Sequence, residues 1–223
     1  MVEIISIYGG LLLKAMGQTC LLALLGLLFG SLLGLIFGIL GVLKNRVCQT
    51  IEQVFVTIIR GVPMIVLAYF VYFGVTYGLN NMLGLGITLS GLQAGTICLS
   101  LNCGAYMAEI IRAGIQSVDK GQMEAARSLG LPYWRAMQRV VLPQAIRTMI
   151  PTIVNQFIIT LKDTSILSVI GFPELVNSAK NVVANTFKSL QVWFIVGIMY
   201  LIIITILTRV AKRLERRLAR GRE

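Results

Sequence analysis

The chain has 223 residues, of which 57% are hydrophobic and only 13% are charged. Ordinary soluble domains contain about 25% charged residues, and a mean hydropathy of +0.83 leaves too few polar side chains to cover a soluble core of this size. The composition therefore excludes a soluble globular protein and favours a membrane protein. The formal net charge of +11 needs its own explanation, because a basic excess is also typical of nucleic-acid-binding proteins.

Long stretches without charged residues predict the membrane-spanning helices, since about 20 apolar residues in a helix cross a hydrocarbon core about 30 Å thick. Charged residues are missing from Ala15–Leu43, Gly61–Ala108 and Ser189–Thr208. The middle stretch is too long for one crossing, and its Gly- and Asn-rich segment 77–86 predicts a turn between two helices. We therefore expect an all-α membrane protein, a single transmembrane domain over 1–223, with five transmembrane helices at about residues 18–43, 56–77, 88–111, 146–169 and 190–209.

The two ends of the chain carry further signals. The apolar run at 18–43 is longer than the 7–15-residue core of a signal peptide, and no small-residue cleavage pattern follows it, so a membrane helix is the better interpretation. Residues 2–13 are apolar but too short to cross, and we expect them to lie along the membrane surface. The basic tail at 211–220 has leucines at helical spacing, which predicts a continuation of the last helix along the anionic inner leaflet.

The distribution of basic residues predicts the orientation. Fifteen of the twenty Lys and Arg residues fall in three segments that five crossings place on one side, namely 44–55, 112–147 and 209–223. The opposite side holds Lys14, Lys180 and Lys188. Because Lys and Arg accumulate in cytoplasmic loops, we expect the N-terminus outside and the C-terminus in the cytoplasm. The positive charge is thus a topology signal in a lipid bilayer, and no nucleic-acid partner is expected.

The residue inventory argues against enzyme chemistry in this chain. The sequence contains no His, and its four cysteines (Cys20, Cys48, Cys98 and Cys103) show no paired spacing. This pattern predicts neither a disulfide framework nor a zinc site. Without His, Cys pairs or clustered carboxylates, a membrane-embedded enzyme is disfavoured, and we expect no cofactor and no metal.

The first predicted helix carries Gly26, Gly30, Gly34 and Gly38 at steps of four residues. Small residues at this spacing let two helix backbones approach closely in lipid. The pattern predicts that this helix packs tightly against another one, and a structural role is much the better interpretation than a functional one.

The segment 112–145 is the longest predicted cytoplasmic loop, and a loop of that length either has structure of its own or is disordered. Its residues predict one short helix at 122–129, stopped by Gly130, and a second at 132–142, ended by Pro143. With aromatic Tyr133 and Trp134 exposed, two short helices at the membrane face suggest a docking surface. A solvated loop is the alternative.

One motif in this segment is specific. It comprises Glu124-Ala125-Ala126, Gly130 and Val140-x-Leu142-Pro143, and it resembles the EAA loop of ATP-binding-cassette importer permeases, with Val140 where that family usually has Ile. The flanking segments Arg60–Pro63, Ala105–Arg112 and Leu161–Leu167 are similar to the polar amino-acid uptake branch, which contains histidine-, arginine- and glutamine-type permeases. The resemblance extends over most of the chain.

The resemblance implies a type I ABC importer permease fold in the plasma (inner) membrane of a prokaryote. In that family the EAA helix docks on a separate ATPase subunit, so Glu124, Ala125, Ala126, Gly130 and Pro143 are the expected ATPase-coupling residues. The sequence contains no G-x-x-x-x-G-K-[ST] phosphate-binding loop, so ATP hydrolysis is expected on the partner chain. An extracytoplasmic amino-acid-binding protein is the other expected partner. A stand-alone channel or secondary carrier is the alternative function, although sparse intramembrane charge and the lack of an inverted repeat argue against it.

Polar residues inside the predicted helices mark candidate substrate contacts, because ionisable groups in a membrane are expensive and usually functional. Thr152, Gln156, Thr160 and Asp163 share one helical face, and other helices offer Asn102, Glu109, Thr57 and Arg60. The predicted substrate-binding set is Asn102, Gln156, Thr160, Asp163, Glu109 and Thr57. The alternatives are structural pairing of Glu109 with Arg112, and of Lys162 and Asp163 with neighbouring helices.

Five helices do not enclose a pathway, so we expect a second permease subunit, identical or paralogous. Asp163 or Glu109 suits a cationic amine or guanidinium, while the amides and hydroxyls suit neutral polar groups. The sequence does not indicate which amino acid is transported among arginine, histidine, lysine and glutamine.

Overall fold

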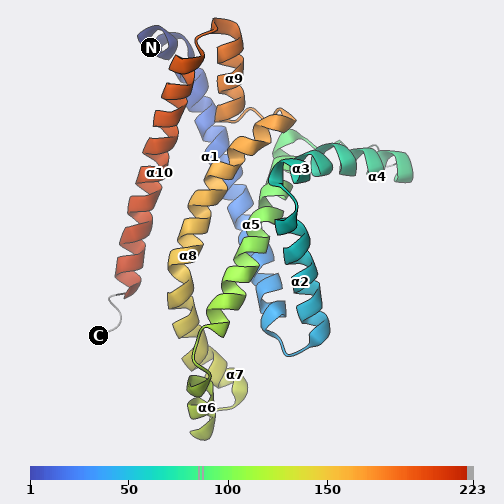
Figure 1. Ribbon diagram of the computed structural model, residues 1–223, viewed down its shortest axis with the longest axis vertical. Coiled ribbons are helices and arrows are strands. Elements are labelled where there is room, and N and C mark those ends of the chain that lie inside the picture. Colours follow the sequence, from blue (N-terminus) through green and yellow to red (C-terminus); the bar gives the residue numbers. More distant parts are fainter. Residues whose placement is uncertain (85, 87, 220–223) are drawn as a thin grey trace.

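The computed structural model describes residues 1–84, 86 and 88–219 of the chain, and the regular elements of this part are all helices (Figure 1). In chain order they are α1 Val2–Val42, α2 Arg46–Gly61, α3 Met64–Tyr69, η1 Phe70–Val75, α4 Thr76–Leu83, α5 Gly91–Gln116, α6 Lys120–Ser128, α7 Tyr133–Ala136, η2 Met137–Val141, α8 Leu142–Asp163, η3 Thr164–Ile170, α9 Leu175–Thr186 and α10 Ser189–Ala219. The segments η1 and η2 are π-helical and η3 is a 3-10 helix.

Five helical segments among the described residues are long and apolar enough to cross a membrane, which confirms the predicted number. They are Val2–Val42, Met64–Met82, Gly91–Gln116, Tyr133–Ile170 and Ser189–Arg213. In Figure 1, α1, α5, α8 and α10 run along the long axis of the molecule, with α9 at one end and the short helices α6 and α7 at the other.

The glycine ladder of α1 packs directly on α5. A Cβ atom added at Gly26, Gly30, Gly34 or Gly38 would lie 2.3–2.8 Å from the Cβ of Leu99, Cys103, Met107 or Ile111, respectively. Such distances are far below van der Waals contact, so only glycine permits this approach of the two helices. The prediction of a packing role is confirmed, and the partner is α5 of the same chain.

The N-terminal residues 2–13 continue α1 as one uninterrupted helix, so the prediction of a separate surface segment is wrong. Their apolar side chains have a packing partner that the sequence did not reveal. Ile4 and Leu12 are buried in a cluster with Leu175 of α9 and Val192 of α10. At about 1.5 Å per residue, the 41-residue α1 is about twice as long as a hydrocarbon core is thick.

The second predicted helix, at 56–77, is broken. Helix α2 ends at Gly61, Val62 is extended, and α3 begins at Met64 after Pro63. Because proline disfavours a helical conformation in the residue before it, Val62 leaves the helix. In Figure 1 the α3–η1–α4 segment turns sideways from the end of α2. The helical stretch of this region that is long and apolar enough to cross a membrane therefore begins at Met64 rather than in α2.

Pro143 does not end the second short cytoplasmic helix, contrary to the prediction. The helix that begins at Tyr133 passes through η2 into α8 and continues to Asp163. A proline removes one backbone N–H bond and crowds the carbonyl four residues earlier. The π-helical turn Met137–Val141 directly before Pro143 widens the backbone there, which lets the helix continue.

Helix α9 was not predicted, and a buried carboxylate starts it. Glu174 is fully buried and accepts hydrogen bonds from the backbone N–H groups of Val176 (2.8 Å) and Asn177 (2.6 Å). The Tyr200 hydroxyl of α10 donates to the same carboxylate at 3.5 Å, and the Leu175 N–H donates to Thr19 of α1 at 3.1 Å. Glu174 therefore fixes the point where α1, α9 and α10 meet.

We expect Gly34→Ala to weaken the protein, because its Cβ would lie 2.3 Å from that of Met107. Overpacking of this kind costs about 1–3 kcal/mol. Gly17→Ala is the matched control, since Gly17 lies in the same helix with nothing within 4 Å of an added Cβ. Thermal unfolding of the detergent-purified chain should show a lower midpoint for Gly34→Ala and an unchanged or higher one for Gly17→Ala. Equal midpoints would contradict the close approach.

Glu174 should make stability depend on pH. Burial raises the pKa of its carboxyl to about 7, partly offset by the two backbone N–H groups. The folded state therefore binds a proton that the unfolded state releases between about pH 4.5 and 7, so stability is highest at the acidic end of this window and falls as pH rises through it. A fall in the melting midpoint on the order of 5 °C is expected. Glu174→Gln, which cannot ionise, should flatten the profile; an unchanged slope would contradict the assignment.

Candidate functional site

A cavity of about 430 Å³ lies beside the break between α2 and α3, where α5 and α8 face it. Its lining consists of Arg60, Gly61, Val62, Pro63, Met64, Asn102, Tyr106, Gln156, Ile159 and Asp163. We call it the first cavity. Broken helices supply polar backbone at membrane depth only where it lines a cavity or is buried in protein, and the extended Val62-Pro63 segment is such a place. The volume is in the range of small-molecule sites.

Three predicted substrate residues meet in the first cavity. The Asn102 amide donates a hydrogen bond from Nδ2 to Oδ2 of Asp163 at 3.2 Å, which links α5 to the end of α8. Gln156 lines the same cavity and is 4% exposed. The arrangement brings a carboxylate and two amides together from residues that are up to 61 positions apart.

Thr160 lies behind these residues rather than in the cavity lining. It is 1% exposed, and its hydroxyl accepts a hydrogen bond from Nε2 of Gln156 at 3.5 Å. Thr152, at the other end of the predicted polar face, is exposed. Thr160 therefore orients Gln156 and does not itself contact the cavity.

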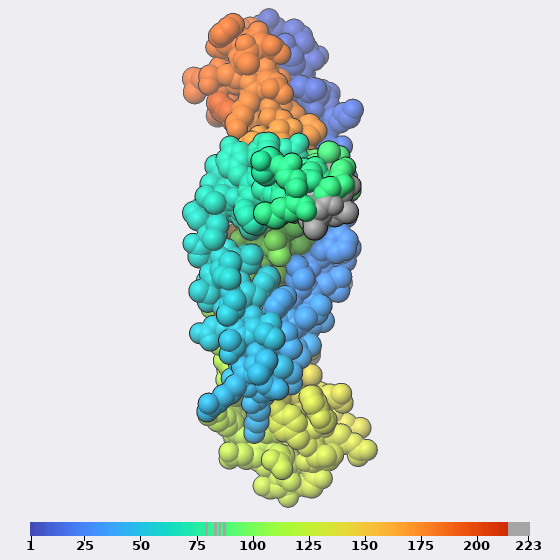
Figure 2. Space-filling view, turned by 90° about the vertical axis from the view of Figure 1, so that its right-hand side faces the viewer, coloured from blue at the N-terminus to red at the C-terminus, as the bar shows by residue number. Residues whose placement is uncertain are grey.

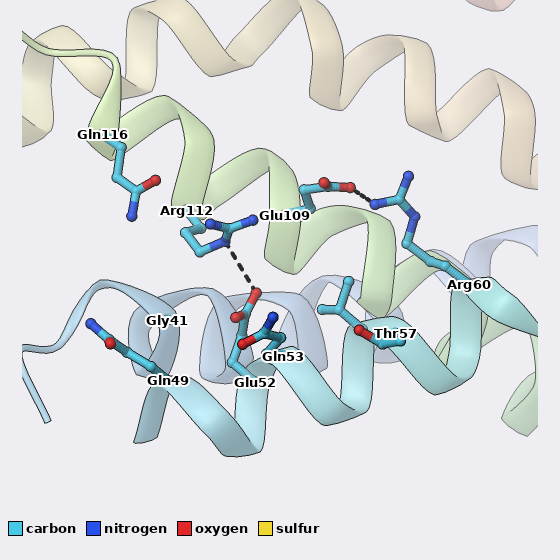
Figure 3. A pocket seen from close by; sticks show the side chains of 10 residues that line it. Gly41, Gln49, Glu52, Gln53, Thr57, Arg60, Glu109, Arg112 and Gln116 are labelled. Carbon is cyan, nitrogen blue, oxygen red and sulfur yellow. Dashed lines mark ion pairs between the residues drawn. The ribbon is translucent and has the colours of Figure 1, made fainter. Parts of the chain in front are cut away.

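Arg60 and Glu109 form an ion pair between α2 and α5 (Figure 3). The Arg60 guanidinium also lies over the ring of Tyr106, 4.7 Å from its centroid, a cation–π arrangement. Both charged side chains remain about one-third exposed. Arg60 lines the first cavity, whereas Glu109 points into a second one.

The second cavity, of about 450 Å³, lies between α2 and α5. Its lining consists of Gly41, Gln49, Glu52, Gln53, Val56, Thr57, Arg60, Glu109, Arg112 and Gln116. Arg112 pairs with Glu52 of α2, with Nε and Oε1 3.3 Å apart (Figure 3). The alternative pairing of Glu109 with Arg112 is therefore wrong, because each residue of that helical turn finds an opposite charge on α2 instead.

The structure thus divides the predicted substrate residues into two groups. Asn102, Gln156 and Asp163 line the first cavity, while Glu109 and Thr57 line the second. Tyr106 and Glu52 were missed by the sequence reasoning. Tyr106 stands in the Ala105–Arg112 segment that carried part of the family resemblance. Glu52 was overlooked because the second membrane helix was expected to start at 56.

Four of the five predicted coupling residues lie in or just after α6, which lies beyond the ends of α5 and α8 (Figure 1). Figure 2 shows this end of the molecule protruding past α1 and α2. Glu124 and Ala125 of α6 are exposed, whereas Ala126 is buried. Pro143 is exposed in the first turn of α8. Trp134 is exposed and Tyr133 partly buried against it, so one of the two expected aromatics is on the surface.

Gly130 ends α6 in a left-handed conformation with φ of +85°. The Gly130 N–H donates to the Arg127 carbonyl at 2.9 Å, and the Leu131 N–H donates to the Ala126 carbonyl at 3.2 Å. This pair of hydrogen bonds is a Schellman motif, in which glycine avoids the steric penalty of a Cβ. Gly130 therefore sets the direction in which the chain leaves α6 toward α7.

The family model described as "Binding-protein-dependent transport system inner membrane component" matches residues 26–220. The chain belongs to this family. It is 36% identical over 208 residues to the glutamine transport system permease protein GlnP of Escherichia coli (strain K12), covering 93% of each chain. It is 39% identical over 168 residues to the arginine transport system permease protein ArtQ of Bacillus subtilis (strain 168), covering 75% of this chain and 74% of the relative.

A solved structure, described as a crystal structure of an amino acid ABC transporter with histidines, superimposes with a TM-score of 0.87 at 32% identity, over 97% of both chains. The membership and the five apolar helices identify a multi-pass membrane component of an ABC-type importer. The type I permease fold implied by the EAA-like motif is confirmed by this likeness.

Proposed function

We propose that the chain is the transmembrane permease subunit of an ATP-driven importer that moves polar or cationic amino acids into the cytoplasm. The observation that carries the proposal is the first cavity, where Asp163, Asn102 and Gln156 converge next to a helix break. A carboxylate binds an ammonium or guanidinium group, and the amides donate to or accept from a polar side chain. The relatives named for glutamine and arginine transport support this class of substrate.

The six predicted substrate residues take different parts in this proposal. Asp163, Asn102 and Gln156 contact the substrate, and Thr160 holds the Gln156 amide in place through their hydrogen bond. Glu109 and Thr57 line the second cavity, through which the substrate passes after the first. Because both cavities share Arg60, they adjoin each other along α2.

Energy comes from a separate ATPase subunit that docks on α6. The exposed Glu124 and Ala125 contact this partner, while the buried Ala126 holds α6 against the rest of the chain. Gly130 and Pro143 shape the connection from α6 to α8. A displacement of α6 is passed to α7, and from there along the continuous helix Tyr133–Asp163 to Asp163. The concentration of basic residues in the segments 44–55, 112–147 and 209–223 supports a cytoplasmic α6 and an N-terminus outside. The bacterial relatives support the plasma (inner) membrane of a prokaryote as the location.

Two further partners complete the importer. A second permease subunit, identical or paralogous, closes the pathway that five helices leave open, and an extracytoplasmic binding protein delivers the amino acid.

The direct test of the proposed function is uptake of a panel of labelled amino acids by the assembled complex in liposomes. ATP-dependent uptake of glutamine or a cationic amino acid supports the proposal. ATP-independent uptake would instead indicate a channel or secondary carrier.

Asp163→Asn should reduce uptake of cationic amino acids more than that of neutral ones, by about tenfold or more, because a charge-assisted hydrogen bond is lost. Asp163→Glu keeps the charge and should keep the order of preference. Initial uptake rates for arginine and glutamine, normalised to the amount of complex, provide the measurement. An equal loss of uptake for arginine and glutamine would show that Asp163 does not set the preference for cationic amino acids.

Gly130→Ala should lower transport and transport-coupled ATP hydrolysis, because alanine at φ of +85° is strained by about 1–2 kcal/mol. Gly130→Asn is the matched control, since asparagine tolerates the left-handed conformation better.

Glu124→Ala should lower the coupling of transport to ATP hydrolysis without changing the amount of chain in the membrane. Uptake and ATPase rates of the reconstituted complex report both effects. Wild-type uptake in Gly130→Ala and Glu124→Ala would exclude the docking role.

A further inference from the structure

The first cavity carries opposite charges on two different helices. Arg60 comes from the last turn of α2, and Asp163 comes from the end of α8. Of the ten residues that line this cavity in the described part of the chain, Arg60 alone is cationic and Asp163 alone is anionic. Every α-amino acid presents a carboxylate at neutral pH, and a cationic amino acid adds a positively charged side chain. The cavity therefore offers Arg60 to the carboxylate that all amino acids share, and Asp163 to the charged side chain of a cationic substrate.

The Arg60 side chain is positioned for a second anion. Its contact with Glu109 is made through one terminal nitrogen, and a guanidinium has five N–H donors in a planar fork. The ring of Tyr106 lies against the guanidinium face and leaves its edges free to donate. About one-third of the side chain is exposed, and that side chain borders the first cavity. Arg60 can thus exchange its contact with Glu109 for one with a substrate carboxylate.

Other basic side chains near the first cavity are less suited to bind a substrate carboxylate. Lys162 is adjacent to Asp163 in sequence but is exposed and does not line the first cavity. Arg112 lines only the second cavity and is paired with the buried Glu52. A planar guanidinium also binds a carboxylate with two parallel hydrogen bonds, which an ammonium group does not.

We propose that Arg60 binds the α-carboxylate of the transported amino acid, and that Glu109 holds the guanidinium when the first cavity is empty. The proposal rests on the proposed function and adds a specificity-determining residue to it. Because Arg60 borders both cavities and Glu109 only the second, the incoming carboxylate competes with Glu109 for the same guanidinium. Substrate arrival thereby loosens the ion pair between α2 and α5.

The test is equilibrium binding to the purified permease–ATPase complex without the extracytoplasmic binding protein, because that protein would impose its own selection. Glutamine and arginine are each compared with their α-amides, which lack only the carboxylate charge. The wild-type complex should bind at least one of these acids about ten- to a hundredfold more tightly than its amide. Arg60→Gln should abolish this preference for the acid, and Arg60→Lys should reduce it.

Glu109→Gln is the matched control, because it breaks the same ion pair while keeping Arg60. It should preserve or increase the preference for the acid, whereas a purely structural role of the pair would make Glu109→Gln and Arg60→Gln behave alike. Lys162→Gln should leave the preference unchanged. A preference that survives in Arg60→Gln, or disappears in Glu109→Gln, would overturn the proposal while leaving amino-acid transport intact. A wild-type complex that binds and transports no amino acid would instead refute the proposed function itself.

Discussion

The close approach of α1 to α5 is the contact on which the rest of the structure depends. In a bilayer, helices gain little from hiding apolar side chains, so tight packing of small residues must hold them together. The ladder from Gly26 to Gly38 provides that packing at four positions along α5. With one face of α5 fixed against α1, a neighbouring face carries Asn102, Tyr106 and Glu109 toward α2 and α8. The structural face and the functional face belong to the same helix.

The scarcity of charge inside the membrane determines how the site is built. Ionisable groups shielded from water between helices need partners, and two ion pairs between α2 and α5 supply them, Arg60 with Glu109 and Arg112 with Glu52. The break at Val62-Pro63 opens the first cavity directly beside the first of these pairs. The same residues thus stabilise the packing of α2 and offer charges to a substrate. Arg60, which is about one-third exposed and borders the first cavity, is the cation of these pairs that a substrate there can reach.

The sequence predicted the number of membrane helices, the packing role of the glycine ladder and the family, because apolar length, four-residue spacing and the EAA-like motif are local signals. Its failures came from contacts between distant residues and from one unusual helical turn. Residues 2–13 were taken for a surface segment since their partners in α9 and α10 lie more than 160 positions away. Pro143 was expected to end a helix because the π-helical turn before it has no sequence signature. Residues on one helix, such as Gln156 and Asp163, were predicted together, whereas the Arg60–Glu109 pair required knowing how α2 packs on α5.

The central claim is that the first cavity holds the substrate with its two charged groups between α2 and α8. A structure of the permease–ATPase complex with a bound amino acid, determined by electron cryomicroscopy, tests this most directly. The account predicts density in the first cavity, with the α-carboxylate within hydrogen-bonding distance of Arg60 and, for a cationic amino acid, the charged side chain next to Asp163. Substrate density bound elsewhere, or oriented with its carboxylate away from Arg60 while Arg60 stays paired with Glu109, would contradict it.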